Sequence, residues 1–155
     1  MESRKKKLLM DFIKVTVITA LVICGMIIYK DWVNRSEAVR AMEGIGREVV
    51  EYRKANASVP SEAWIEGRKE FIAGALRLGD VNYRSLWIKI DTPPDEIFAY
   101  TTNGYGFFFK KEFIVLRLNG NVDLMSEQQL KQELAKIQSP AELHSLTKKQ
   151  RPEEL

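Results

Sequence analysis

The chain has 155 residues, of which 45% are hydrophobic, and its formal net charge is +3. This length leaves room for one domain together with an anchor and a tail. The charge is too small to produce the single-sign field that attracts nucleic acid, so we expect no nucleic-acid binding. The one dense basic run, residues 4–7, directly precedes an apolar segment, and this position favours a cytoplasmic membrane flank.

Residues 8–29 form the apolar segment, in which only Asp11 and Lys14 are charged. As a helix this segment is about 33 Å long, which is enough to cross the hydrocarbon core of a bilayer. Asp11 and Lys14 lie three residues apart, so they share a helix face and can partly neutralise each other. We predict a transmembrane helix over residues 8–29.

A cleaved signal peptide is the main alternative to a retained anchor. The stretch CGMIIYKDW has no A-x-A-like cleavage site, and bulky Met26, Ile27 and Ile28 stand where small residues are needed. We therefore expect the anchor to be retained. The basic flank, residues 1–7, then lies in the cytoplasm and the rest of the chain on the far side.

The sequence continues from the apolar segment into charged, helix-forming residues without a break. Apolar residues recur at steps of four and three, as on one face of an amphipathic helix: Ala38, Met42, Ile45, Val49 and Tyr52. Gly44 and Gly46 weaken such a helix by up to about 1 kcal/mol each relative to Ala. Either they permit close packing of a neighbouring element or they are simply tolerated. We predict one helix of about 50 residues, which ends before Pro60.

A second helix is expected after Pro60. Ser61 can cap it, and Gly79-Asp80 closes it after Leu78. The side chains expected to be buried on this helix are Trp64, Ile65, Phe71, Ile72, Ala75 and Leu76.

The following segments predict an antiparallel sheet of three or four strands. YRSLWIKI is β-prone, residues 91–96 form a connecting loop, and Asn103-Gly104 and Asn119-Gly120 each suit a hairpin turn. We expect one apolar face, covered by the stripe on the first helix. The candidates for that face, or their alternates, are Phe98, Tyr100, Phe107, Phe109, Val115 and Leu118.

A last helix is predicted over SEQQLKQELAKIQ, where Ser126 and Gln129 fit a capping box. Its narrow apolar stripe of Leu130, Leu134 and Ile137 packs either on the domain or on a partner. Residues 139–155 are expected to form a mobile tail. The predicted extracytoplasmic head therefore comprises residues 30–138.

This order of parts resembles the type IV pilin and type II secretion pseudopilin family. YKDW is similar to the region where pilin helices leave the membrane, and YRKANASVP is similar to the stretch that ends the long helix. DTPPDEIFAYTTNGYGFFF resembles the start of the sheet in some pilin-like proteins. The resemblance covers residues 8–125 and implies an α+β fold, with a long helix packed on a small antiparallel sheet.

The sequence departs from that family at the processing site, because RKKKLLMDFIKV contains no Gly. If Tyr29 aligns with the tyrosine of the family, Met10 stands where the family has Glu and Asp11 is one position away. In the family this carboxylate pairs with a neighbouring subunit. Asp11 is either an assembly residue of that kind or a residue paired locally with Lys14. Gly25 lies where pilin helices loosen on assembly, or is an ordinary glycine of a membrane helix.

Catalytic chemistry is not expected. His144 is the only histidine and lies in the predicted tail, so no histidine metal site or Ser-His-Asp triad is assembled. No glycine-rich phosphate loop is present. Asp91, Asp95 and Glu96 could line a weak Ca²⁺ site, but an ordinary solvated loop is the favoured interpretation. We expect no enzyme activity and no cofactor.

Two functions remain open. In the first, the chain is a pilin-like subunit of a bacterial inner membrane that assembles through its helix with like subunits, with copies of itself, or with a secretion or pilus platform. In the second, it is a non-polymerising protein with a single membrane span, whose head is a binding or scaffold module. The unbroken helix favours the first function, and the missing processing motif favours the second.

Overall fold

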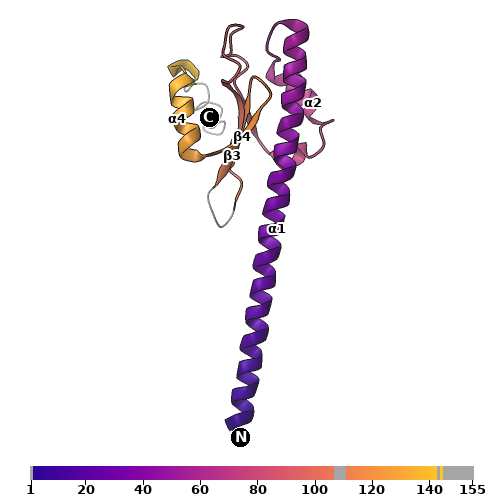
Figure 1. Ribbon diagram of the computed structural model, residues 1–155, viewed down its shortest axis with the longest axis vertical. Coiled ribbons are helices and arrows are strands. Elements are labelled where there is room, and N and C mark those ends of the chain that lie inside the picture. Colours follow the sequence, from indigo (N-terminus) through magenta and orange to yellow (C-terminus); the bar gives the residue numbers. More distant parts are fainter. Residues whose placement is uncertain (1, 107–110, 143, 145–155) are drawn as a thin grey trace, which may run out of the picture.

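The computed structural model describes residues 2–106, 111–142 and 144, which form an α+β fold with one long helix (Figure 1). The helices are α1 (Glu2–Asn56), α2 (Glu62–Lys69), α3 (Ala75–Leu78) and α4 (Glu127–Ile137). The strands are β1 (Val81–Tyr83), β2 (Ile97–Thr101), β3 (Glu112–Arg117) and β4 (Val122–Ser126), in the order β1-β2-β3-β4 of one antiparallel sheet. The predicted fold class, a long helix packed on a small antiparallel sheet, is confirmed.

Helix α1 is continuous over 55 residues, as predicted. Its first half projects from the head towards the N-terminus, and its second half runs along the sheet (Figure 1). At its end Ala57 adopts a left-handed conformation, with φ at 49°, and its N–H donates to the carbonyl of Arg53 at 2.9 Å. The helix therefore stops before Pro60, whose ring prevents it from continuing.

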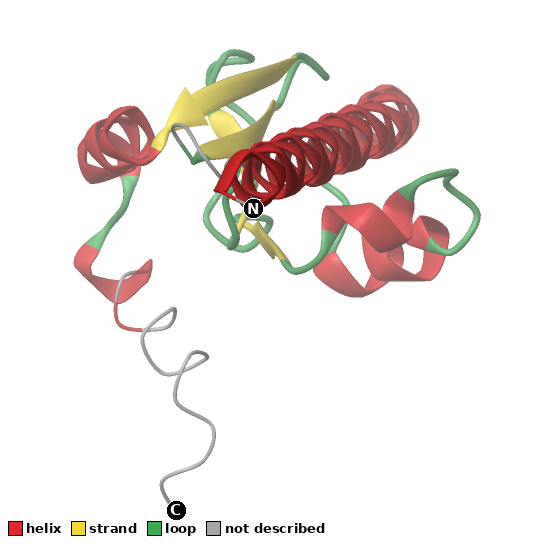
Figure 2. Ribbon diagram, turned by 90° about the horizontal axis from the view of Figure 1, so that it is seen from below, coloured by secondary structure: helices red, strands yellow, loops and turns green. Residues whose placement is uncertain are grey.

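The predicted stripe on α1 is buried against the sheet. Ala38, Met42, Ile45 and Val49 are at most 1% exposed and belong to one core cluster with residues of β2 and β3. Tyr52 is half-buried and packs edge-on against Trp64 of α2, with ring centroids 4.8 Å apart. The view along the helix shows α1 lying across the sheet (Figure 2). This stripe is what fixes the head to the helix.

The two glycines in this part of α1 lie where other segments approach the helix closely. A Cβ atom on Gly46 would lie 2.8 Å from the carbonyl oxygen of Gly120 and 2.8 Å from Leu116 Cδ1. A Cβ atom on Gly44 would lie 2.8 Å from Ile72 Cγ2. Of the two alternatives for these glycines, close packing is therefore the correct one.

The single helix predicted over residues 61–78 is wrong. Ser61 caps α2 as expected, but the chain leaves the helix after Lys69, and Gly74 has a φ of 83° that breaks the helical path. The break changes which side chains face the core, because the helical period no longer holds across it. Ile65 and Ala75 are buried, whereas Phe71 is 85% and Leu76 99% exposed, against the prediction.

The β-prone stretch YRSLWIKI contributes only Tyr83 to a strand, because β1 ends there. The N–H of Arg84 still donates to the carbonyl of Phe98 at 2.9 Å, and the N–H of Trp87 then donates to the carbonyl of Arg84 at 2.8 Å. The chain thus turns immediately after the pairing with β2. Tertiary pairing overrides β propensity here, as it often does for short segments.

Of the two predicted hairpins, the one at Asn119-Gly120 is confirmed. Arg117 and Asn121 close the turn between β3 and β4, and Gly120 has a φ of 87°, which favours glycine. The tight hairpin predicted at Asn103-Gly104 is wrong, because β2 pairs with β3 and Tyr105 pairs with Glu112. The predicted face residues Phe107 and Phe109 lie outside the described residues.

The sheet has two apolar faces rather than the one predicted. The pairing of β2 with β3 shifts at Phe98, so that Phe98 and Ala99 both join the α1 side, while Ile97 and Tyr100 join the other side. Such a bulge interrupts the alternation that sequence patterns rely on. Of the predicted face residues, Phe98 and Leu118 lie on the α1 side, whereas Tyr100 and Val115 lie on the other side.

Helix α4 covers the second face. Leu130 and Leu134 are buried against Ile97, Tyr100 and other residues of the sheet, so the apolar stripe of this helix packs on the domain. Both hydrogen bonds of the capping box predicted at its start are present. The sheet therefore lies between α1 and α4 (Figures 1 and 2).

Candidate functional site

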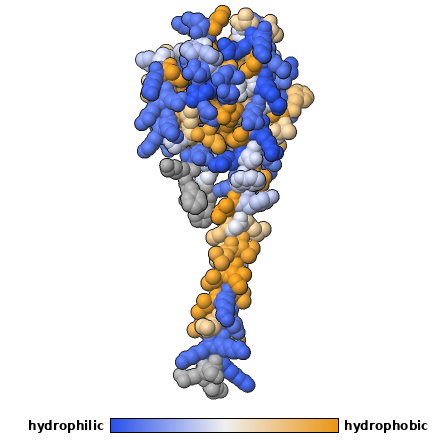
Figure 3. All heavy atoms as spheres, viewed as in Figure 1, coloured by the Kyte–Doolittle hydropathy of each residue, from blue (hydrophilic) through white to orange (hydrophobic). Residues whose placement is uncertain are grey.

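Exposed apolar side chains surround the first half of α1. Figure 3 shows this surface as a continuous apolar stem below the head, with hydrophilic residues at its N-terminal end. By length and composition the helix is able to cross a membrane, and its most apolar window has none of its surface buried. An apolar surface on all sides of a helix is unfavourable in water and suits lipid. This stem is the candidate membrane-binding region.

Asp11 and Lys14 lie next to each other on the stem. Lys14 Nζ is 3.9 Å from Asp11 Oδ1, and both side chains are more than half exposed. Of the two alternatives for Asp11, the local pair is present within a single chain. An exposed pair of this kind contributes at most about 1 kcal/mol in water, so it does not prevent either residue from taking another partner.

The polar side chains further along the stem are satisfied within the helix itself. The hydroxyl of Thr16 donates to the carbonyl of Phe12 and that of Thr19 to the carbonyl of Val15, each at 2.9 Å. Local bonding of this kind lowers the cost of placing a hydroxyl in lipid. Thr16 and Thr19 are therefore compatible with a membrane span.

Gly25 lies in the regular helix, and a Cβ atom there would meet nothing within 4 Å. Its proposed loosening on assembly stays a prediction. Tyr29 is 67% and Trp32 60% exposed, with ring centroids 6.3 Å apart. Aromatic rings of this kind are enriched at the membrane–water interface. Trp32 was not among the predicted site residues, although its spacing of three from Tyr29 places both on one helix face.

The head begins shortly after these aromatic residues. The guanidinium of Arg35 pairs with Glu112 at the start of β3, and Glu37 pairs with Arg77 at 3.3 Å. Arg35 lies six residues after Tyr29, which corresponds to about 9 Å along a helix. The contacts between α1 and the rest of the head therefore begin close to the end of the apolar surface.

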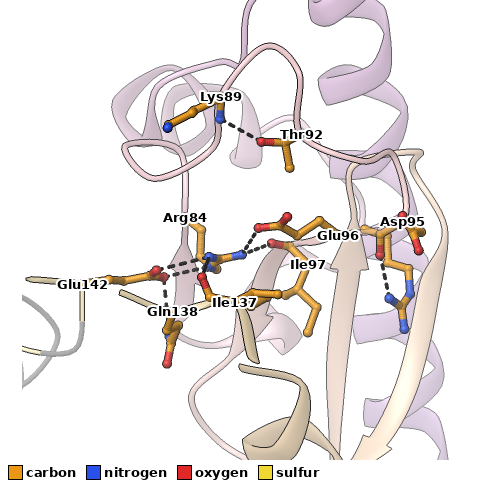
Figure 4. Close-up of polar contacts among 10 residues, drawn as sticks. Arg84, Lys89, Thr92, Asp95, Glu96, Ile97, Ile137, Gln138 and Glu142 are labelled. Carbon is orange, nitrogen blue, oxygen red and sulfur yellow. Dashed lines mark hydrogen bonds and ion pairs between the residues drawn. The ribbon is translucent and has the colours of Figure 1, made fainter. Parts of the chain in front are cut away.

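A buried cluster of charges lies beside the C-terminal end of α4 (Figure 4). Arg84 is 3% exposed, and its Nε and Nη2 atoms lie 2.6 and 3.1 Å from the two carboxylate oxygens of Glu142. Its Nη1 atom donates to Glu96 at 2.9 Å and to the carbonyl of Ile97 at 2.8 Å. Burial alone lowers the pKa of Arg84, but the hydrogen bonds to Glu142 and Glu96 outweigh it and raise the pKa above its ordinary value.

Glu142 belongs to the head, although the predicted head ends at residue 138. The residue is 1% exposed, and its N–H donates to Ser139 Oγ at 3.2 Å. Sequence reasoning missed this contact. The sequence S-P-A-E at residues 139–142 is typical of a helix start. Ser139 is suited to the N-cap, Pro140 to the first helical position and Glu142 to the third. Residues 143 and 145–155 lie outside the described residues.

The loop at residues 91–96 does not gather its acidic side chains around one point. Glu96 turns inward to Arg84, whereas Asp91 and Asp95 are exposed. Within the described ranges, no group of three His, Cys, Asp or Glu side chains is arranged to hold a metal ion.

A scan against protein-family models, a search of curated proteins and a search of solved structures each found no match to the chain. The structure by itself defines a class: an α+β head built on a helix that is long and apolar enough to span a membrane. The resemblance to pilins and pseudopilins stays a prediction.

Proposed function

We propose that the chain is a membrane-anchored, pilin-like structural subunit that acts through its helix. Residues 8–29 would hold it in a bacterial inner membrane, with the N-terminus in the cytoplasm and the head outside. Its partners would be membrane lipid and the helices of like subunits or of a secretion or pilus platform. The observation that supports this most directly is the unbroken course of α1 from the apolar stem into the core of the head.

A continuous helix couples the span to the head mechanically. Ala38 and Ile45 belong to the same helix as Gly25, and no joint separates them. When spans pack side by side, each head is therefore set at a fixed height and rotation relative to its neighbours. Burial of apolar helix surface between subunits, in place of lipid, would hold the assembly together.

A non-polymerising scaffold is the second candidate function. The pair between Asp11 and Lys14 favours it, because it satisfies the carboxylate within one chain. The missing glycine of the processing site favours it as well. In this alternative the anchor only holds the head at the membrane surface, and the head binds a partner.

Cysteine crosslinking in membranes distinguishes the two candidates. Cys24 is the only cysteine of the chain and lies exposed on the stem, so oxidation reports which residues neighbour it. We expect oxidised membranes to yield a covalent dimer that Cys24→Ser abolishes. A single cysteine moved to Leu21, Val22, Ile23 or Gly25 in that background should crosslink on one helix face only. Absence of dimer at every position would favour the scaffold.

A further inference from the structure

A groove lies at the end of the head furthest from the stem. It forms where the last turns of α1 meet the loop at residues 89–90 and the turn between β3 and β4. Its volume is about 320 Å³, in the range of sites that hold a few side chains of a ligand. The residues that matter for its chemistry are Val50, Arg53, Lys54, Lys89, Ile90 and Leu118.

The charge of this groove is entirely positive. Arg53, Lys54 and Lys89 line it, and none of the described residues that line it is acidic. Arg53 is fixed in place, because its Nη1 donates to the carbonyl of Leu118 at 3.1 Å. Among the ion pairs of the described residues, none involves Lys54 or Lys89.

The end of α1 accounts for only part of this charge. A helix C-terminus carries about half a negative charge, which cations in the last turn such as Arg53 and Lys54 neutralise. Lys89 belongs to a separate loop, so the helix does not explain its position. Glu51 and Asp91 are exposed neighbours in the sequence, but neither lines the groove. A net positive site therefore remains.

Apolar surface accompanies the cations. Ile90 is 79% exposed, and Val50 contributes a second half-exposed apolar side chain from α1. A ligand that carries only negative charge would leave this surface in contact with water. The groove is complementary to a ligand with both carboxylates and a bulky apolar group.

Distance excludes lipid of the protein's own membrane as that ligand. Arg53 lies 24 residues beyond Tyr29 on the continuous helix, which corresponds to about 36 Å. Charges exposed to water are screened over about 8 Å at physiological ionic strength. Headgroups near Tyr29 therefore do not reach the groove, and its ligand comes from outside the membrane.

We infer that this groove binds an acidic peptide segment of a partner protein, with a bulky apolar residue among its carboxylates. The carboxylates pair with Lys54 and Lys89, and the apolar side chain covers Ile90 and Val50. The inference uses the anchored orientation of the proposed function but not its assembly. Failure of the spans to crosslink therefore leaves it standing.

The test uses full-length protein in nanodiscs of zwitterionic lipid and the fluorescein-labelled peptide GEELFEEG. We expect saturable binding, measured by fluorescence anisotropy. The double substitution Lys54→Glu and Lys89→Glu should weaken the affinity about tenfold or more. Ile90→Ser should weaken it as well. The charge-matched control is Lys131→Glu with Lys136→Glu on α4, which should bind like the wild type. All four lysines are exposed, so the substitutions leave the core unchanged, and thermal unfolding of each variant checks that the head is folded at the temperature of the binding assay.

Three results would overturn the inference. One is no binding of the peptide up to about 1 mM. Another is wild-type affinity of the Lys54→Glu, Lys89→Glu variant. The third is equal affinity for GEESSEEG or for inorganic polyphosphate, because a site for bare anions would not need the apolar group.

Discussion

Gly46 of α1 lies against Gly120 in the turn between β3 and β4, so closely that a Cβ atom on Gly46 would be 2.8 Å from the Gly120 carbonyl oxygen. This contact brings the helix and the hairpin to the distance at which Val49 and Leu116 share one core. Neither backbone can retreat without separating α1 from the sheet. The packing of the hairpin against the helix therefore depends on the absence of a side chain at residue 46.

We predict that Gly46→Ala destabilises the head by about 1–3 kcal/mol, since overpacking outweighs the gain in helix propensity of at most about 1 kcal/mol. Urea unfolding of the full chain in detergent, followed by tryptophan fluorescence, measures the difference. Gly67→Ala in α2 is the matched control, because a Cβ atom there would meet nothing within 4 Å, so only the gain in helix propensity remains. Equal stability of Gly46→Ala and the wild type would contradict the close contact.

A charge placed on the buried stripe should separate the head from its helix. Ile45 is 1% exposed within the core, so Ile45→Asp buries a carboxylate without a partner and should cost several kcal/mol, about 3 or more. The control is Arg47→Asp, two residues further along α1 on the exposed side, which should change stability little. Unfolding of the two variants under the same conditions gives the comparison. A wild-type transition for Ile45→Asp would argue against this packing.

The buried cluster around Arg84 should be sensitive to removal of one charge. Arg84→Met leaves Glu96 and Glu142 without their cation, and loss of one member of a buried pair costs about 3–5 kcal/mol. Combining it with Glu142→Gln should recover part of that loss. The raised pKa of Arg84 keeps its guanidinium charged between about pH 6 and 9, so titration of Arg84 itself adds no pH dependence to the wild-type protein in this range. If the loss in the double variant equals the sum of the losses in Arg84→Met and Glu142→Gln measured singly, the two residues do not act as a pair.

Tyr105 gives the head a measurable dependence on alkaline pH. Burial raises its pKa from 10.0 to about 12, and its single hydroxyl hydrogen is shared between the carbonyl oxygens of Arg77 and Leu78, which lie 2.7 and 2.9 Å from the hydroxyl oxygen. Because the folded pKa is the higher one, the stabilisation is complete below pH 10 and is lost as pH rises towards 12. Tyr105→Phe should therefore be less stable than the wild type at pH 9, with a difference that shrinks above pH 10. A difference independent of pH would show that the hydroxyl does not titrate with unfolding.

Sequence patterns predicted the parts of the fold that depend on local period and turn chemistry. The stripe through Met42 and Ile45 follows the helical repeat, and Asn119-Gly120 supplies the left-handed residue that its turn requires. These features are repeated or local, so neighbouring residues are enough to reveal them. Tertiary contacts decided the rest.

The errors share one cause, which is a contact between residues far apart in the sequence. The bulge at Phe98 moves one strand residue to the other face, and the kink at Gly74 lets the chain approach Glu37 of α1. The burial of Glu142 depends on Arg84, 58 residues away. No local pattern contains such pairings, although the capping signal at Ser139 marked the segment as ordered.

For the stem, the sequence predicted the membrane-spanning length and the aromatic end at Tyr29, and the helix carries both. It also left two alternatives for Asp11, and the local pair with Lys14 shows that one of them is available within a single chain. A second chain would have to compete with Lys14 for that carboxylate.

The last prediction concerns that competition. If spans assemble, Asp11 has to exchange Lys14 for a cation on a neighbouring chain, and a carboxylate without a partner near lipid is costly. Asp11→Ala should then leave membrane insertion intact, because the basic flank still sets the orientation, while Cys24 crosslinking falls in part. Lys14→Ala is the matched control: it removes the local pair but keeps the carboxylate, so crosslinking should stay at or above the wild-type level. An Asp11→Ala protein that crosslinks as well as the wild type would instead support the scaffold, in which Lys14 is the partner that Asp11 keeps.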